Sequence, residues 1–310
     1  MDASSVTCRP SHGGPTQFRA TGFRGKDDLL IAAETCGAED GQPVVLLPGV
    51  GRTRRSWRDA AACLAADGYR VTSIDLRGQG GRGWPRDGDY SLSAYVDDIH
   101  AVLRRLGGRV VLIGASIGGV AALLTACEAM HGDVAGLGLV DVLPSASGNG
   151  CSSFERFMAH CVGGFDTIDE AGLAATRFFR AGLTYRTQKD LRNSLRRGFD
   201  GRWYWHWDPE TARRPGDLMR NGIGKLLGAR ASIDTPTLLV TGAGGDRPDP
   251  QFIEAFRALV PGLQWADVSS QAGEHPRPAM QLAVPPVLRF IRANWPARRA
   301  GAATPAGFIN

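Results

Sequence analysis

Short apolar runs alternate with amphipathic stretches along most of the chain. Apolar runs of about four to eight residues that end at glycine or proline predict buried strands. We expect such strands at 43–47, 69–76, 109–114, 136–142, 237–241 and 263–268. Helical spacing of apolar residues between these runs predicts helices at about 57–64, 92–106, 117–130, 249–260 and 278–294. This order predicts an α/β fold with a mainly parallel sheet and helices on both faces.

The pattern also divides the chain into a core, an insertion and two tails. Residues 18–36 read as two strands joined near Gly25, which predicts an antiparallel hairpin at the edge of the sheet. Residues 145–232 contain helical patterns and aromatic residues but no clear strand, so we interpret them as an insertion. The predicted segments are a core at 15–144 and 233–296, the insertion at 145–232, and flexible tails at 1–14 and 297–310.

Composition excludes several classes of protein. Hydrophobic residues make up 43% of the 310 residues and charged residues 22%, which rules out disordered and fibrous chains. The net charge of +5 comes from arginines scattered along the chain. Without a nucleic-acid-binding motif, we interpret them as solvated surface and expect no nucleic-acid partner. No apolar run approaches the roughly 20 residues of a membrane span, and the N-terminus does not resemble a signal peptide. We therefore expect a cytoplasmic protein with no membrane partner.

The six cysteines give no sign of a metal site. They lie far apart, and none forms a C-x-x-C pair or a cluster with histidine at zinc-binding spacing. We expect reduced thiols, with Cys63 and Cys127 as small core residues of predicted helices. We expect neither a metal nor a cofactor.

One serine lies where a strand turns directly into a helix. The run VVLI is followed by Gly114-Ala115-Ser116-Ile117-Gly118-Gly119 and then by an apolar helix. This is G-x-S-x-G in the strand–turn–helix context in which the motif presents a nucleophile. The turn exposes the serine hydroxyl at the carboxyl edge of the sheet. It also places the Ile117 N–H at a helix N-terminus, where it can stabilise an oxyanion.

Five motifs in this order give the chain its family resemblance: LLPGVGRTRRSW, IDLRGQG, GASIGG, TLLVTGAGGD and AGEHPRP. With them, residues 17–295 resemble the α/β-hydrolase superfamily, specifically its lid-bearing esterase, lactonase and C–C hydrolase group with a serine nucleophile. The family's order of catalytic residues is serine, acid, histidine. The resemblance therefore implies a triad of Ser116, Asp246 and His275, with Asp141 as the alternative acid.

The second oxyanion donor of the family comes from the loop after the first central strand. Here that loop is Pro48-Gly49-Val50-Gly51, and the resemblance makes the Val50 N–H the candidate donor beside Ile117. Pro48 stands where the family usually has a histidine that braces this loop. Gln79 stands where the family often has a second histidine, so both departures bear on the geometry of the oxyanion site.

The resemblance implies that residues 145–232 form a helical lid over the serine. Three tryptophans fall within five residues of this segment, with one histidine between them: Trp203, Trp205, His206 and Trp207. One interpretation is that these side chains pack the lid onto the core. The other is that they form an apolar wall around a bulky substrate, which His206 could also touch.

These features predict a cofactor-independent serine hydrolase that acts on an ester, thioester or lactone of a bulky, largely apolar small molecule. Hydrolysis of C–C bonds and perhydrolysis fit the same triad. One alternative, motivated by Pro48 and Gln79, is a lyase, eliminase or cyclase that uses the histidine as a proton shuttle. A second is a non-catalytic ligand-binding receptor on the same fold. The sequence leaves the substrate and the oligomeric state open.

Overall fold

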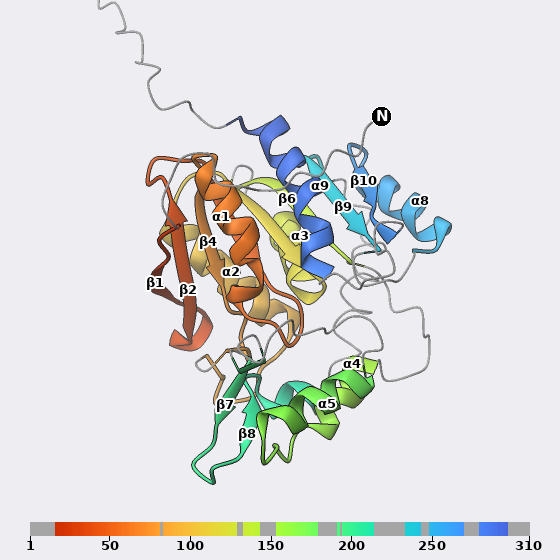
Figure 1. Cartoon of the computed structure of the whole chain (residues 1–310). Helices are drawn as coiled ribbons and strands as arrows, with labels where there is room; N and C mark the ends of the chain where they lie inside the picture. Colours follow the sequence, from red (N-terminus) through yellow and green to blue (C-terminus); the bar gives the residue numbers. More distant parts are fainter. Residues whose placement is uncertain are drawn as a thin grey trace, which may run out of the picture.

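The structure is a computed structural model of the whole chain (Figure 1). It describes residues 16–80, 83–128, 133–142, 153–178, 191–192, 194–213, 233–242, 248–269 and 279–296. The helices within these ranges include none that is long and apolar enough to cross a bilayer.

An eight-stranded sheet forms the centre of the molecule, in the order β1-β2-β4-β3-β5-β6-β9-β10. Its strands are β1 (Arg19–Arg24), β2 (Leu30–Gly37), β3 (Pro43–Leu47), β4 (Arg70–Ile74), β5 (Val110–Ala115), β6 (Val134–Val140), β9 (Thr237–Thr241) and β10 (Gln264–Asp267). The pairs from β4 through β10 are parallel. β1 and β2 form the predicted antiparallel hairpin at the edge. The α/β fold with a mainly parallel sheet is therefore confirmed.

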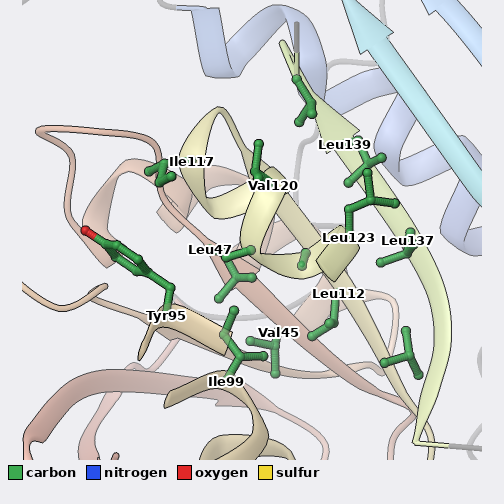
Figure 2. Packing of buried hydrophobic residues seen from close by; sticks show 14 of the residues in the cluster. Val45, Leu47, Tyr95, Ile99, Leu112, Ile117, Val120, Leu123, Leu137 and Leu139 are labelled. Atoms are coloured by element: carbon green, nitrogen blue, oxygen red, sulfur yellow. The ribbon is translucent and has the colours of Figure 1, made fainter. Parts of the chain in front are cut away.

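Helices cover both faces of this sheet, and each strand sends alternate side chains to the two sides. On one side, Val45 and Leu47 belong to the same buried cluster as α2 (Leu92–Leu106), α3 (Ile117–Glu128) and α8 (Pro250–Leu259). Figure 2 shows this packing around β3, β5 and β6. On the other side, Val44 and Leu46 pack with α1 (Arg58–Ala66) and α9 (Ala279–Asn294). Burial on both faces explains why the central strands read as continuous apolar runs.

The ends of the core helices follow the expected capping chemistry. Ser91 caps α2, since its Oγ accepts a hydrogen bond from the Ala94 N–H at 3.3 Å, and Gly107 follows the last turn with a φ of 66°. Asp249 caps α8 through a 2.8 Å bond from the Gln251 N–H to its Oδ1. A side-chain oxygen at this position satisfies one of the unpaired N–H groups of the first turn.

Between β6 and β9 the chain leaves the sheet. The described elements of this segment are α4 (Ser153–His160), α5 (Ile168–Phe178), β7 (Leu195–Arg197), β8 (Trp203–Trp205) and the 3₁₀ helix η3 (Pro209–Arg213). β7 and β8 pair as an antiparallel hairpin whose tip points away from the main sheet (Figure 1). The expectation of no strand in this region is wrong. Strands of three residues are too short to show a periodicity of two in the sequence.

The hairpin contributes to a separate small core. Trp205 and Trp207 stack with ring centroids 5.0 Å apart, and Phe157 of α4 meets both rings edge-on. All three side chains are buried. The segment between β6 and β9 therefore has an aromatic core of its own, formed by residues of that segment.

The cysteines correct two expectations. Cys63 of α1 is disulfide-bonded, so the prediction of reduced thiols throughout is wrong. Cys36 and Cys161 are free and buried. Cys127 is free but exposed, because it lies in the last turn of α3, beyond the part that packs on the sheet. The described residues contain no cluster of His, Cys, Asp and Glu side chains suited to a metal ion.

Candidate active site

Ser116 lies at the junction of β5 and α3, as the sequence predicts. Its φ is +48°, a left-handed conformation that a non-glycine residue adopts at an energetic cost. Hydrogen bonds hold the turn on both sides. The Ser116 N–H donates to the Val140 carbonyl at 2.9 Å, and its carbonyl accepts from Gly119 and Val120 at 2.9 and 3.0 Å. The strained backbone at Ser116 is therefore fixed by its neighbours.

The glycines of the motif are required by close backbone contacts. A Cβ on Gly114 would lie 2.4 Å from the Gly118 carbonyl oxygen, and one on Gly119 would lie 2.3 Å from the Val142 side chain. A Cβ on Gly118 would lie 2.5 Å from the Pro48 oxygen and 2.9 Å from that of Leu47. These distances are below any normal Cβ contact. The glycines let the start of α3 press against β5 and against the end of β3.

The loop after β3 lies beside Ser116 in space. A Cβ on Gly49 would lie 3.4 Å from the Ser116 Cβ, so the two backbones are neighbours. After Gly49 the chain makes a turn that the Arg52 N–H closes by a 3.1 Å bond to the Gly49 carbonyl. Gly51 supplies the positive φ, 68°, that such a turn needs at its third residue. We call residues 49–52 the 49–52 turn.

Two backbone N–H groups flank the serine. Val50 is the second residue of the 49–52 turn, and Ile117 is the first residue of α3. Neither N–H donates a hydrogen bond to another described residue. The N–H of Ile117 belongs to the first helical turn, whose N–H groups have no partner within the helix. The two amides named from the sequence thus lie on the two loops beside Ser116.

Gln79 fixes the 49–52 turn from the loop after β4. Its side chain is buried, and its Oε1 accepts a 2.9 Å hydrogen bond from the Arg52 N–H. Asp75 acts on the next residues of the same segment, since its Oδ1 accepts from the Arg54 N–H at 2.7 Å. The sequence marked Gln79 only as a departure from the family pattern. Its hydrogen bond to Arg52 shows that the loop is held without a histidine at that position.

The arginines after the turn form a charge network. Arg54 pairs with Asp75 and with Glu34, and Arg58 makes a bidentate pair with Glu34 at 2.9 and 3.0 Å. The Arg54 side chain is only 18% exposed and both carboxylates are buried. The interpretation of this arginine group as solvated surface is therefore wrong for Arg54.

A second buried pair anchors the loop after β4. Arg77 and Asp98 form two hydrogen bonds of 2.8 Å, and both side chains are almost fully buried. Asp98 also accepts from the Lys26 N–H at 2.8 Å. Arg77 thus ties the residues that precede Gln79 to α2, and it is a further exception to the interpretation of the arginines as surface.

The structure places His206 against the loop after β4. The imidazole is 6% exposed, and its Nδ1 accepts a 3.4 Å hydrogen bond from the Gly80 N–H. Burial lowers the pKa of His206 to about 4, and the charges of Arg52, Arg54 and Arg55 act in the same direction. The histidine is therefore neutral near pH 7. Its predicted contact with a substrate stays a prediction.

The three tryptophans named from the sequence have different environments. Trp205 and Trp207 are buried in the aromatic core described above, and Trp203 is partly buried. Arg192 and Arg197 lie over the Trp203 ring at 5.8 and 6.0 Å. Val50 packs against both this aromatic core and the main core. The 49–52 turn therefore lies where the two cores meet.

The other two members of the predicted triad lie outside the described residues. These are Asp246 and His275. Asp141, the alternative acid, directly follows β6, and the pairing of Ala115 with Val140 places it level with Ser116 on the neighbouring strand. Like Ser116, it has a φ of +48°. Adjacent strands lie about 4.8 Å apart, so Asp141 is close to the serine.

Comparison with known proteins agrees with this architecture. A model of the "Alpha/beta hydrolase family" matches residues 44–281, which is most of the chain. This chain belongs to the α/β-hydrolase family. Among solved structures, this α/β hydrolase is similar to one from Novosphingobium aromaticivorans, with 23% identity, a TM-score of 0.66, and coverage of 90% of this chain and 99% of that one. A thioesterase domain from the curacin biosynthetic pathway gives a TM-score of 0.69 at 20% identity, with 90% of this chain and 99% of that one covered. At these identities the likeness concerns the fold.

Two curated relatives are named as esterases. The esterase Rv0045c of Mycobacterium tuberculosis is 37% identical over 105 residues, which cover 33% of this α/β hydrolase and 34% of the relative. Protein phosphatase methylesterase 1 of Mus musculus is 28% identical over 152 residues, which cover 47% of this chain and 39% of the relative. The matched region thus spans little more than a third of the length of each relative.

Proposed function

We propose that this α/β hydrolase is a cofactor-independent serine hydrolase that cleaves an ester, thioester or lactone. The observation that carries the proposal is the position of Ser116. It has a strained backbone between β5 and α3, next to a second loop, and each loop has an N–H group without a described partner. The names of the two partial relatives, both esterases, support the same reaction class.

In the proposed reaction His275, oriented by Asp246, accepts the proton of the Ser116 hydroxyl as Oγ attacks the carbonyl carbon. The N–H groups of Val50 and Ile117 stabilise the negative charge on the carbonyl oxygen. His275 then donates its proton to the leaving alcohol or thiol. A water molecule, deprotonated by His275, attacks the acyl-enzyme, and Ser116 regains its proton as the acid product leaves.

For the substrate we propose a bulky, largely apolar acyl group. Val50 packs against the aromatic core of the inserted segment, so this apolar cluster reaches the 49–52 turn. In the proposed enzyme the segment between β6 and β9 is the lid, and its aromatic residues select the acyl chain. A panel of p-nitrophenyl esters of increasing chain length tests this, and we expect kcat/KM to rise with length.

The alternative of a lyase or eliminase was motivated by Pro48 and Gln79. Gln79 supplies a hydrogen bond that holds the 49–52 turn, so its presence gives no reason to expect a disabled oxyanion site. A fluorophosphonate probe separates the two reactions, because it labels a serine only when that serine is activated as a nucleophile. We expect labelling of the parent enzyme and a loss of ester turnover of about 10³-fold or more in Ser116→Ala.

The matched control is Ser93→Ala, which removes an exposed hydroxyl from the first turn of α2 and should leave labelling intact. Absence of labelling in the parent enzyme, or full turnover by Ser116→Ala, would contradict the proposal. The acid is tested by comparing Asp246→Asn with Asp141→Asn. We expect about a 10³-fold loss of kcat in the first and a much smaller one in the second. The reverse result would assign the acid to Asp141.

A further inference from the structure

The loop of residues 77–80, here called the 77–80 loop, touches two parts of the molecule at once. On one side, Gln79 accepts the hydrogen bond from Arg52 that holds the 49–52 turn. On the other, its two neighbours bind the residues that follow β8. The Gly78 carbonyl accepts from the Asp208 N–H at 2.7 Å, and the Gly80 N–H donates to His206 at 3.4 Å. Gln79, which binds the 49–52 turn, therefore lies between Gly78 and Gly80, which bind the inserted segment.

Further contacts secure this junction. The Tyr90 hydroxyl donates to Asp208 Oδ2 at 2.5 Å. The positions of Gly78 and Gly80 leave no room for side chains, because a Cβ there would lie 2.4 Å from the Tyr90 ring and 2.2 Å from the Asp75 carboxylate. Both glycines also have positive φ values, 76° and 74°. Only glycine fits at these two positions, so the backbone of the 77–80 loop packs directly against Tyr90 and Asp75.

Asp75 also holds the segment after β3, and its contact does not involve the inserted segment. Arg54 is bound through its backbone and its side chain to Asp75, and both belong to the core. The Arg52 N–H, by contrast, is shared between the Gly49 carbonyl of its own turn and Oε1 of Gln79. Loss of the Gln79 bond should shift the start of the segment, where Val50 lies, while residues from Arg54 onward stay in place.

We propose that Gln79 is a positioning residue that aligns the Val50 N–H with Ser116, and that docking of His206 and Asp208 on the 77–80 loop sets this alignment. The proposal rests on the serine-hydrolase function proposed above. It makes the oxyanion site of this enzyme dependent on the inserted segment, so the segment would act on the rate of the chemical step as well as on substrate choice.

Kinetics of four variants test the positioning role with a p-nitrophenyl ester. Gln79→Ala removes the acceptor, and we expect kcat to fall about 10- to 100-fold with KM within about 3-fold, since the oxyanion contact acts in the transition state. Gln79→Glu keeps a side-chain oxygen at the same reach and should restore at least a third of the parent kcat. His206→Phe removes the acceptor for Gly80 and should lower kcat about 5- to 10-fold. Gln251→Ala makes the same change at an exposed glutamine of α8, outside the inserted segment, and should stay within 2-fold of the parent.

The double variant Gln79→Ala/His206→Phe tests the coupling. If both residues act through the same turn, its loss of kcat should resemble that of Gln79→Ala alone. Multiplied losses would overturn the coupling, and a kcat for Gln79→Ala within 2-fold of the parent would overturn the positioning role.

Hydrogen exchange of the Arg52 amide gives a readout that does not need activity. We expect faster exchange at Arg52 in Gln79→Ala and in His206→Phe, with unchanged exchange at Arg54 in both. If the parent enzyme were not labelled at Ser116 while these exchange changes occurred, the proposed function would fail and the mechanical link would stand. Unchanged exchange at Arg52 in His206→Phe would overturn the link itself.

Discussion

The two loops that flank Ser116 are held in place in different ways. The turn between β5 and α3 is held by the sheet from which it emerges: its glycines admit close backbone contacts with the end of β3, and Ser116 forms hydrogen bonds with Gly119, Val120 and the Val140 carbonyl of β6. The 49–52 turn has its closing bond from Arg52 to Gly49 but depends for position on Gln79, which comes from another strand. One turn is held by neighbouring strands of the sheet, and the other by a side chain from the loop after β4.

This difference has a functional consequence. A turn held by neighbouring strands keeps its geometry as long as the sheet is folded. The position of the 49–52 turn depends on Gln79, and the neighbours of Gln79 bind residues of the inserted segment. A shift of that segment should therefore also shift the turn. We therefore expect the position of Ser116 to stay constant in the proposed site, and the position of the Val50 N–H to change with the docking of the inserted segment.

The largest expected effect comes from the tight contact between the start of α3 and the end of β3. Gly118→Ala would bring a Cβ to 2.5 Å from the Pro48 oxygen. We expect a loss of about 3 kcal/mol in the free energy of unfolding, in the range of severe packing conflicts. Urea unfolding measures it. Gly163→Ala is the matched control, because a Cβ there meets nothing within 4 Å, and it should change stability by less than about 0.5 kcal/mol. Equal effects at the two positions would contradict the account of the turn between β5 and α3, here called the elbow.

A smaller effect is the pH dependence of the free energy of unfolding that we expect from His206, which contacts the 77–80 loop. His206 has a pKa lowered to about 4 by burial, against 6.5 for a free histidine, so the unfolded chain binds a proton between these values that the folded protein does not. This contribution is fully present above pH 6.5 and declines as the pH falls toward 4. Between pH 7.5 and 5 it amounts to about 2 kcal/mol of stability.

His206→Phe should lack this part of the pH dependence, and urea titrations of both proteins at the two pH values give the difference. The groups around the imidazole are Arg52, Arg54, Arg55 and the Asp75 carboxylate beside Gly80. An identical pH dependence in parent and variant would remove His206 from this role.

The smallest of the three effects concerns the docking of the inserted segment. Tyr90→Phe keeps the buried ring and removes the hydrogen bond to Asp208. We expect a loss of about 1 kcal/mol in the free energy of unfolding, with faster hydrogen exchange at Asp208 and unchanged exchange at Ser116. Equal acceleration at both amides would mean that the elbow is not locally held.

The same contrast explains how far the sequence predicts the structure. The central strands, the main helices and the elbow are all local patterns, such as the apolar run of β5 and the glycines around Ser116, and all were predicted within a few residues. The cap at Asp249 and the edge hairpin around Gly25 are of the same kind. Each depends on residues that are close together in the chain.

What the sequence missed depends on contacts between distant residues. Gln79 carries no local sign that it binds Arg52, and Arg54 and Arg77 look like surface residues until their buried carboxylate partners are known. Nothing in the sequence around His206 indicates that its imidazole accepts a hydrogen bond from Gly80. β7 and β8 were missed because three-residue strands have no readable period.

The central claim is that Ser116 is the nucleophile of an acyl transfer, and trapping the acyl-enzyme tests it most directly. The parent enzyme is mixed with a p-nitrophenyl ester, quenched in acid within the first turnover and digested, and the peptides are weighed by mass spectrometry. The account predicts the mass of the acyl group on Ser116 in the parent and no acyl group on that peptide in Ser116→Ala. Product formation by the parent without any acyl group on Ser116 would contradict it.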